Sequence, residues 1–370
     1  MKKLSFYILA TILTTAFLFT SCEKDPVVNL SDESILPETF GVVIPKAISQ
    51  EPSTLKSVQV DTLRGNAIYH HLSTFINVGD HGGKIVRDII HAISRYNINS
   101  AMYLSYESDD DGRTKNLEVV ENVTFDGETW EFQLTITDAD SEGNADGGKA
   151  IQIFWNRNPI VGIAILKPYN IDRNTEEEFA NAMFRINYNE EGTQEYDVYM
   201  MVYVSGLPLE DPLDNPYSMS TLKMFAGSNG DIVDVYGNSN HPNATFFAGN
   251  SGFNWAFVAS GDRESDIGVA EVGLPPSNLD EPSRSVLIDY YSIKNVFTRE
   301  LYEVWPTLDS ASVEAYLYNT EAPGFFDTNG FIAGGTSPGS EFDEIENRLP
   351  NLSPYNPKEI TNLSIEFKEN

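Results

Sequence analysis

Cysteine and histidine are scarce in this 370-residue sequence, and both shortages restrict its chemistry. Cys22 is the sole cysteine, so the chain cannot form an internal disulfide. None of the five histidines follows His241. Residues 335–339 read Gly-Thr-Ser-Pro-Gly, the spelling of a serine-nucleophile turn, but that turn needs a helix after the serine and a later histidine. Because Pro338 blocks a helix and the histidine is missing, this match does not predict a hydrolase.

Basic residues are few compared with acidic ones. The sequence has 24 lysines and arginines against 55 aspartates and glutamates, a formal net charge of −31 at pH 7. Lys2 and Lys3 are the only charged residues before position 22, so the rest of the chain has 22 basic residues and a net charge of −33. This charge repels nucleic acid, which we therefore do not expect as a partner. The acids are spread along the chain, as on a solvated acidic surface.

Long apolar runs are missing after residue 20, so we expect no membrane-spanning helix in the body of the protein. The one long run, residues 4–19, follows the basic head Met1–Lys2–Lys3 and is closed by the small residues Thr20 and Ser21. This pattern is typical of a secretory signal peptide covering residues 1–21.

The cysteine directly after this run resembles the lipobox of bacterial lipoproteins, with Phe19 where leucine is usual. The resemblance implies cleavage before Cys22, a diacylglycerol on its thiol and acylation of the new amino end. Lys24 followed by Asp25 resembles the surface-export signal of Bacteroidota lipoproteins. These resemblances imply an outer-membrane lipoprotein on the cell surface or the periplasmic face, with the membrane as partner through the lipid. Residues 22–39 would be the lipidated cysteine and a tether.

Apolar periodicity predicts one amphipathic helix followed by many strands. Residues 83–96 place Ile85, Ile89 and Ile93 on one face at helical spacing. Asp111–Gly112 and Asp126–Gly127 are hairpin turn pairs. We also expect an edge strand at 40–48, a short capped helix at 174–183, a helix at 310–318 and a last strand at 360–367, and leave 285–301 open between helix and strand. The central strands are expected at 101–106, 117–123, 130–136, 150–155, 160–166, 184–188, 197–204, 222–225, 232–236, 244–247, 255–259 and 267–272.

This order predicts a mainly β fold: a large antiparallel sheet, as a half-barrel or a sandwich, with one N-terminal amphipathic helix. The β-rich body would span 40–305, and 306–370 would form a loop-rich, partly helical C-terminal region packed on it. Segments 160–166 and 198–204 are apolar on both faces, so the helix, a second sheet or a ligand should cover the second face. The layout resembles half-barrel envelope proteins that carry lipids, which would imply a pocket of roughly several hundred Å³ lined by these strands.

Two groups of residues could bind a metal ion. The first gathers histidines and aspartates in residues 70–91 without any known ligand spacing, so solvated or hydrogen-bonded histidines are the simpler interpretation. Its members are His70, His71, Asp80, His81, Asp88 and His91. The second resembles the start of a calcium loop, with Asp138, Asp140, Glu142 and Asp146 around Gly143. Lys149 stands where a bidentate glutamate belongs, so a solvated acidic loop is favoured and Ca²⁺ stays a possible cofactor.

Two further motifs are weak. Residues 79–84, Gly-Asp-His-Gly-Gly-Lys, lack the spacing of a phosphate-binding loop, and we interpret their glycines as a sharp entry into the helix. Thr62 and Ser310 follow aspartates in a pattern similar to Bacteroidota O-glycosylation acceptors.

Two functional classes remain. The first is a non-catalytic lipoprotein with a binding or assembly role, whose ligand would be apolar or a glycan. The alternative is a secreted hydrolase that uses carboxylates, although spacing alone cannot select a catalytic pair among 55 acids.

Overall fold

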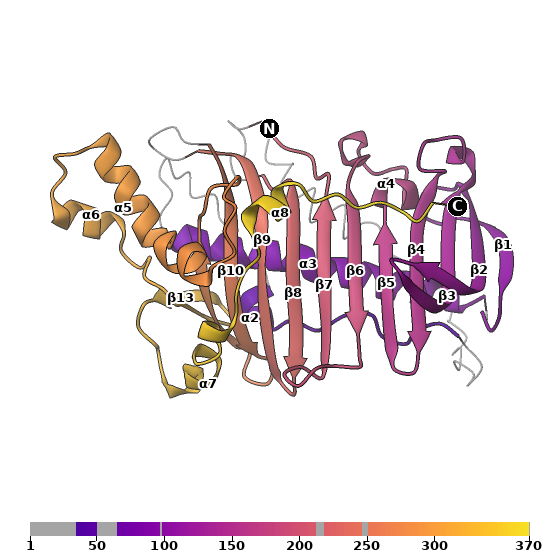
Figure 1. Cartoon of the computed structure of the whole chain (residues 1–370), viewed down its shortest axis with the longest axis horizontal. Helices are drawn as coiled ribbons and strands as arrows, with labels where there is room; N and C mark the ends of the chain where they lie inside the picture. Colours follow the sequence, from indigo (N-terminus) through magenta and orange to yellow (C-terminus); the bar gives the residue numbers. More distant parts are fainter. Residues whose placement is uncertain (1–34, 50–64, 97, 212–217, 246–250, 370) are drawn as a thin grey trace.

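The computed structural model describes residues 35–49, 65–96, 98–211, 218–245 and 251–369. They form one open antiparallel sheet of 13 strands, in which every strand pairs with its neighbours in the sequence (Figure 1). The predicted mainly β fold is confirmed, and the layers that cover this sheet are not a second sheet. The strands are β1 (Met102–Glu107), β2 (Thr114–Phe125), β3 (Glu128–Asp138), β4 (Lys149–Arg157), β5 (Ile160–Leu166), β6 (Met183–Asn189), β7 (Val198–Ser205), β8 (Thr221–Asn229), β9 (Ile232–Thr245), β10 (Ser251–Asp262), β11 (Ile267–Gly273), β12 (Gly324–Asp327) and β13 (Gly330–Gly334).

The helix α3 (Gly65–Ser94) crosses one face of this sheet, which we call the helix face. Alternate side chains of each central strand point to it; in β7 these are Met200, Val202 and Val204, all fully buried. α3 begins at Gly65, which is 18 residues before the start predicted at residue 83. The prediction took Gly82 and Gly83 as the beginning of the helix, but both lie inside it. A Cβ on Gly79 would lie 2.3 Å from Met224 Cε, so glycine lets the helix backbone approach β8 closely. No helix in the described residues is long and apolar enough to cross a membrane.

Residues 35–49 lie on the same face, beside α3. Trp155 Nε1 of β4 donates to the Ile35 carbonyl at 2.8 Å, and at the other end Ala47 N donates to Asp266 Oδ1, before β11, at 3.0 Å. The segment is mostly irregular and ends in the short helix α2 (Lys46–Ser49), so the edge strand predicted at 40–48 is wrong. Its apolar residues pack on the face of the sheet and do not extend its edge.

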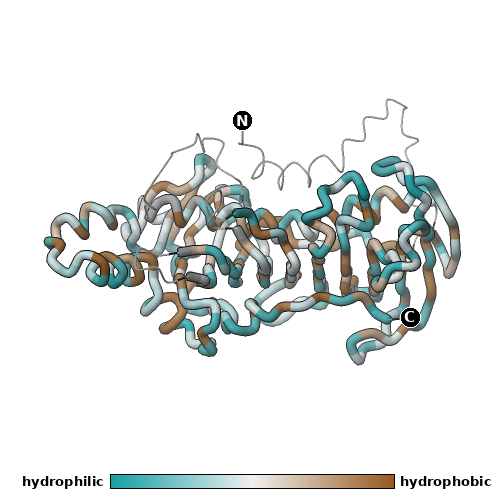
Figure 2. Tube along the Cα trace, turned by 90° about the horizontal axis from the view of Figure 1, so that it is seen from above, coloured by the Kyte–Doolittle hydropathy of each residue, from teal (hydrophilic) through white to brown (hydrophobic). Residues whose placement is uncertain are grey.

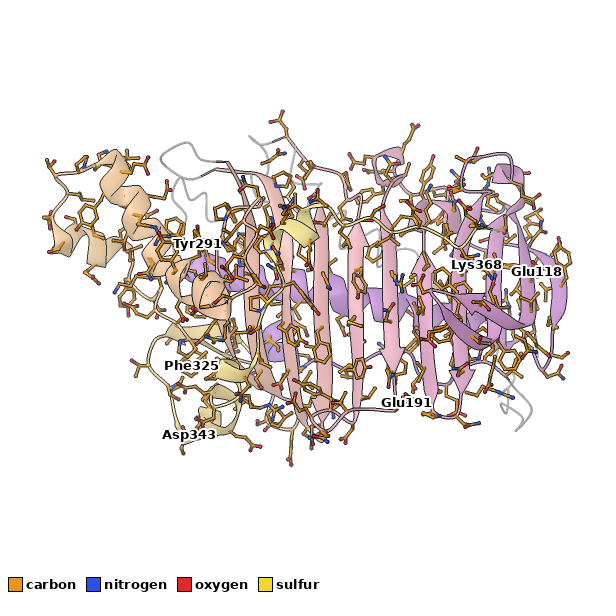
Figure 3. All side chains as sticks on the ribbon, viewed as in Figure 1. Glu118, Glu191, Tyr291, Phe325, Asp343 and Lys368 are labelled. Carbon is orange, nitrogen blue, oxygen red and sulfur yellow. The ribbon has the colours of Figure 1, made fainter. Side chains whose placement is uncertain are left out.

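The opposite face is partly covered by residues 340–369, which we call the C-terminal strap (Figures 1 and 2). Its first half, with α7 (Asp343–Glu346), packs Phe342, Ile345 and Leu349 on β10 to β12. After α8 (Pro357–Thr361) the strap runs irregularly toward β3 and β4, where Figure 3 labels Lys368. The last strand predicted at 360–367 is therefore wrong.

The strap explains why β5 is apolar on both faces. Ala164 and Leu166 face α3, while Ile163 and Ile165 share a second apolar cluster with Ile365 of the strap. Lys368 N donates to Gln152 Oε1 of β4 at 2.8 Å, which attaches the end of the strap to the sheet. For this strand, the second cover that the sequence required is a later part of the same chain.

Several shorter elements differ from the predictions. The helix expected at 174–183 is one turn, Glu177–Phe179. The strand expected at 232–236 continues as β9 to Thr245, into the strand expected at 244–247, whose last two residues lie outside the described part of the chain. Residues 285–301 are helical, with a π-helical turn at Ser285–Tyr290 followed by α5 (Ile293–Val304). α6 (Ser310–Tyr316) confirms the next helix, and the hairpin β12–β13, which was not predicted, extends the sheet. The turn at Asp126–Gly127 is confirmed, with φ of 53° and 82°.

Candidate functional site

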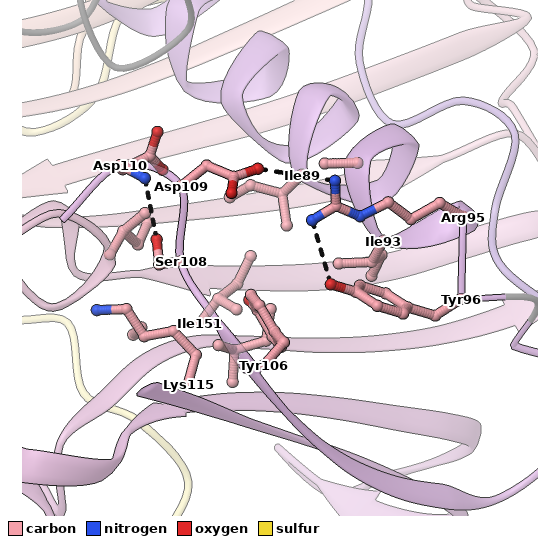
Figure 4. A pocket seen from close by; sticks show the side chains of 14 residues that line it. Ile89, Ile93, Arg95, Tyr96, Tyr106, Ser108, Asp109, Asp110, Lys115 and Ile151 are labelled. Atoms are coloured by element: carbon pink, nitrogen blue, oxygen red, sulfur yellow. Dashed lines mark hydrogen bonds and ion pairs between the residues drawn. The ribbon is translucent and has the colours of Figure 1, made fainter. Parts of the chain in front are cut away.

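A cavity of about 90 Å³ lies where α3 ends against the first strands of the sheet (Figure 4). It is smaller than the lipid pocket expected from the sequence, and neither β5 nor β7 lines it. Its lining comes from the end of α3, from β1 to β4 and from α4 (Pro168–Ile171). The lining residues are Ile89, Ala92, Ile93, Arg95, Tyr96, Tyr106, Ser108, Asp109, Asp110, Lys115, Ile136, Ala150, Ile151 and Ile171.

The floor of the cavity is apolar. Ile93 from the last turn of α3 and Ile136 and Ile151 from β3 and β4 are all nearly inaccessible to solvent. They belong to the main core, so the cavity is a gap at the end of that core. The rings of Tyr96 and Tyr106 lie beside each other, with centroids 5.6 Å apart and planes inclined by 40°. Such a wall accepts the aliphatic part of a ligand.

The mouth of the cavity is polar and is formed by the turn between β1 and β2. Ser108 N donates to the Arg113 carbonyl at 2.9 Å, and Asp110 N donates to Ser108 Oγ at 3.3 Å. Arg95 reaches across from the end of α3, with Nη1 3.7 Å from Asp109 Oδ2 and Nη2 donating to Tyr96 Oη at 3.1 Å (Figure 4). The turn and the helix end thus place charged groups directly above the isoleucine floor.

Lys115 lies deeper, with only 2 % of its side chain exposed. Its ammonium is held 2.9 Å from Asp111 Oδ2 and donates to the Asn170 carbonyl at 3.0 Å. Burial alone would raise the pKa of Asp111, but hydrogen bonds from Lys115 and from the backbone of Arg173 and Arg113 bring it below its usual value. Lys115 is therefore matched by its own carboxylate within the protein.

Asp110 is in a different electrostatic situation. Burial, followed by the neighbouring carboxylates of Asp172, Asp111 and Asp109, raises its pKa from 3.8 to about 6. The described residues contain no ion-pair partner for its side chain. Near neutral pH it is a carboxylate among carboxylates, beside an apolar cavity.

The four acids of the predicted calcium loop have partners within the protein. Asp138, fully buried, lies 3.0 Å from Arg113 Nε and 3.1 Å from Arg173 Nε. Asp146 lies 2.6 Å from Lys167 Nζ. The other two are nearer solvent. Asp140 lies 3.7 Å from Nη2 of Arg113, and Glu142 accepts a hydrogen bond from Nδ2 of Asn116 at 2.8 Å. Within the described ranges, no group of three or more acids or histidines is arranged to hold a metal ion.

The histidines of residues 70–91 all belong to α3. His71 and His91 are 20 residues apart in this helix, which separates them by about 30 Å, so they cannot share one ion. His81 Nδ1 lies 2.9 Å from the carbonyl of Asn77, the bond expected within a helix turn. The side chain of His70 is outside the described residues.

The remaining predicted sites are placed as follows. Cys22 and Thr62 lie outside the described residues. Ser310 is exposed at the start of α6, and the Asp309 before it caps this helix by accepting from Ser312 N at 2.9 Å. Asp309 therefore has a structural role whether or not Ser310 is glycosylated.

Sequence reasoning missed the cavity residues. The sequence predicted a hairpin turn at Asp111–Gly112, which the pairing of β1 with β2 confirms, and placed Tyr106 in an ordinary strand. The available signal was three consecutive acids next to a strand with aromatic residues, but nothing local relates them to the end of α3. No family model, curated protein or solved structure matches this chain, so its function has to be inferred from its own residues.

Proposed function

We propose that this chain is a lipoprotein anchored to the outer membrane through Cys22, and that its folded body binds a small ligand without converting it. The signal-like residues 1–21 before Cys22 support the anchor. The observation that carries the binding role is the cavity at the end of α3, where a buried isoleucine floor meets a polar, partly exposed mouth. A site with apolar walls and a few placed polar groups is the usual form of a ligand pocket.

The composition of the lining supports binding over catalysis. No histidine or cysteine belongs to it, so these residues provide neither a thiol nucleophile nor an imidazole base beside Ser108. The ammonium of Lys115 is occupied by its contacts with Asp111 and with the carbonyl of Asn170. These contacts favour a module that holds its ligand and releases it unchanged.

The binding role is tested on the chain from residue 22 onward with Cys22→Ser, here called the soluble mature chain. Ligand-observed NMR with 1-butanol should show saturable binding, because four carbons suit a cavity of this size. Ala92→Leu should abolish it, because it places three further carbons at the cavity wall. His91→Leu adds the same side chain on the exposed side of the same helix turn and should leave binding intact. Equal binding by all three proteins would rule the cavity out.

The anchor is tested by intact mass of the full-length protein after expression in its native host. Membrane-extracted protein should carry a diacylglycerol adduct on a chain that begins at Cys22, and Cys22→Ser should release the protein from the membrane. A wild-type product that is soluble and unacylated would refute the anchor.

One observation favours the alternative, a carboxylate-dependent hydrolase. Asp109 and Asp110 both line the mouth, and the pKa of Asp110, about 6, suits a general acid. Hydrolysis would need the second carboxylate as base or nucleophile. Chromogenic glycosides incubated with the soluble mature chain should then release their leaving group, and Asp110→Asn should stop this. Turnover no faster than in buffer would refute this alternative.

A further inference from the structure

The charges at the mouth of the cavity do not balance. Arg95 is 3.7 Å from Asp109, and Lys115 is 2.9 Å from Asp111, so each cation that lines the cavity has its own carboxylate. Asp110 stands between these two acids in the sequence and, within the described part of the chain, has no ion pair. Asp172 adds a further negative charge from the segment after α4. The mouth therefore holds a carboxylate in excess, and a bound positive charge would reduce the repulsion there.

Next to this excess charge is space for an aliphatic chain. The floor is built from the side chains of Ile93, Ile136 and Ile151, which are 3 %, 5 % and 1 % exposed. Asp109 is exposed and Asp110 half-buried, so the acids are on the solvent side of that floor. The ring of Tyr106, also part of the lining, adds an aromatic surface beside the acids. An aromatic ring near a carboxylate favours an organic cation.

We propose that this cavity binds a small aliphatic amine, with its alkyl chain on the isoleucine floor and its ammonium group at Asp110. This inference rests on the proposed binding role of the cavity and specifies the class of ligand. The ammonium must stay at the mouth, because a charge placed against isoleucine side chains would be desolvated without compensation. A lysine side chain of a peptide would have to enter with its ammonium first, so a free amine fits this polarity and a lysine residue does not.

The same arrangement rejects acids. A carboxylate ligand with the same alkyl chain would bring another negative charge next to Asp109, Asp110 and Asp111. The repulsion between these like charges opposes the binding of a carboxylate, just as the attraction between opposite charges favours the binding of the amine. A neutral alcohol should fall between the two, since it uses the floor and gains nothing from the charge.

The test compares n-butylamine, 1-butanol and butyrate on the soluble mature chain at pH 7.5 and low salt, with dissociation constants from ligand-observed NMR. Butylamine should bind at least fivefold more tightly than butanol, and butyrate more weakly than either. Asp110→Asn should reduce the affinity for butylamine to that for butanol and leave butanol unchanged. Glu118→Gln removes the same charge from an exposed position on β2, away from the lining, and should change neither.

The outcomes separate this inference from the proposed function. If butanol binds and butylamine binds no better, the cavity takes a ligand but the amine is wrong. If none of the three binds, the proposed binding role fails and the amine with it.

Should Asp110→Asn not fold, the wild-type protein provides a second measurement: its affinity for butylamine should fall from pH 7.5 to pH 5 while that for butanol stays constant. The titratable and charged groups around Asp110 are Asp109 and Asp111 in the same turn, Asp172 after α4, Lys115 on β2, Tyr106 on β1 and, across the mouth, Arg95 at the end of α3. An affinity for butylamine that does not change over this range would overturn the inference.

Discussion

Two glycines three positions apart in α3 should respond in opposite directions to alanine. A Cβ on Gly82 would meet Val202 Cγ1 at 3.5 Å and Phe184 Cδ1 at 3.6 Å, which are ordinary van der Waals contacts. Alanine in a helix interior is favoured over glycine by about 1 kcal/mol, so Gly82→Ala should stabilise the protein by that amount. In a protein of this size the melting temperature should rise by roughly 2 °C.

Gly79→Ala gains the same helix propensity but places its Cβ 2.3 Å from Met224 Cε and 2.9 Å from its sulfur. Met224 is completely buried, so its side chain can move only by displacing other core residues. Overpacking of this kind costs about 1–3 kcal/mol, which should make the net effect destabilising. Thermal and urea unfolding of the two single variants and the wild type would measure both changes. If Gly82→Ala lowers stability, α3 does not lie against the sheet as described, or is not helical there.

Three further predictions concern the charges and the strap. Asp110 has a raised pKa, so the folded state holds its proton more tightly than the unfolded state and loses stability as the pH rises from about 4 to 6. After allowance for solvent screening, urea unfolding should show Asp110→Asn to be more stable than wild type by about 1 kcal/mol at pH 7.5 and equal to it at pH 4. Equal differences at both pH values would contradict this. Arg348→Met removes the guanidinium that lies 2.9 Å from the carboxylate of Asp234, which is only 1 % exposed, and should lower the free energy of unfolding by about 3 kcal/mol. A loss below 1 kcal/mol in denaturant titrations would contradict a buried, charged carboxylate at this position. Ile365→Ala removes the buried contact of the strap with β5, and should lower the free energy of unfolding by about 2 kcal/mol and speed proteolysis near the C-terminus. The control Glu366→Ala, at the exposed neighbouring position, should change neither. Equal cleavage of both variants would mean that the strap is not held by this contact.

The sheet could be predicted because its signals are local. Alternation in β3, where Trp130, Phe132, Leu134 and Ile136 are buried, depends on a two-residue period within one strand. The turn at Asp126–Gly127 depends on two residues that tolerate positive φ. Since each strand pairs with the next one in the sequence, reading the strands in order was enough to predict an antiparallel sheet.

The candidate site could not be predicted in this way. The cavity joins residues of α3 to residues of β1 to β4 and α4, so its existence depends on where the helix ends against the sheet. The acids that the sequence suggested for calcium, Asp138 and Asp146, bind arginine and lysine side chains from other elements. Their spacing resembled a ligand loop, but their partners are separated from them by 21 residues or more.

The sequence by itself determined the mainly β class, the order of the central strands and the expectation of a lipid anchor at Cys22, because each depends on a short stretch of residues. Tertiary structure decided what covers the sheet. The glycines inside α3 looked like a helix start, but Gly79 lies where the helix packs closely on Met224 of β8. The apolar residues of 360–367 looked like a strand, although Ile365 packs on β5 without pairing. Burial drives a segment onto whichever apolar surface the rest of the fold leaves open, and that surface exists only once the sheet has formed.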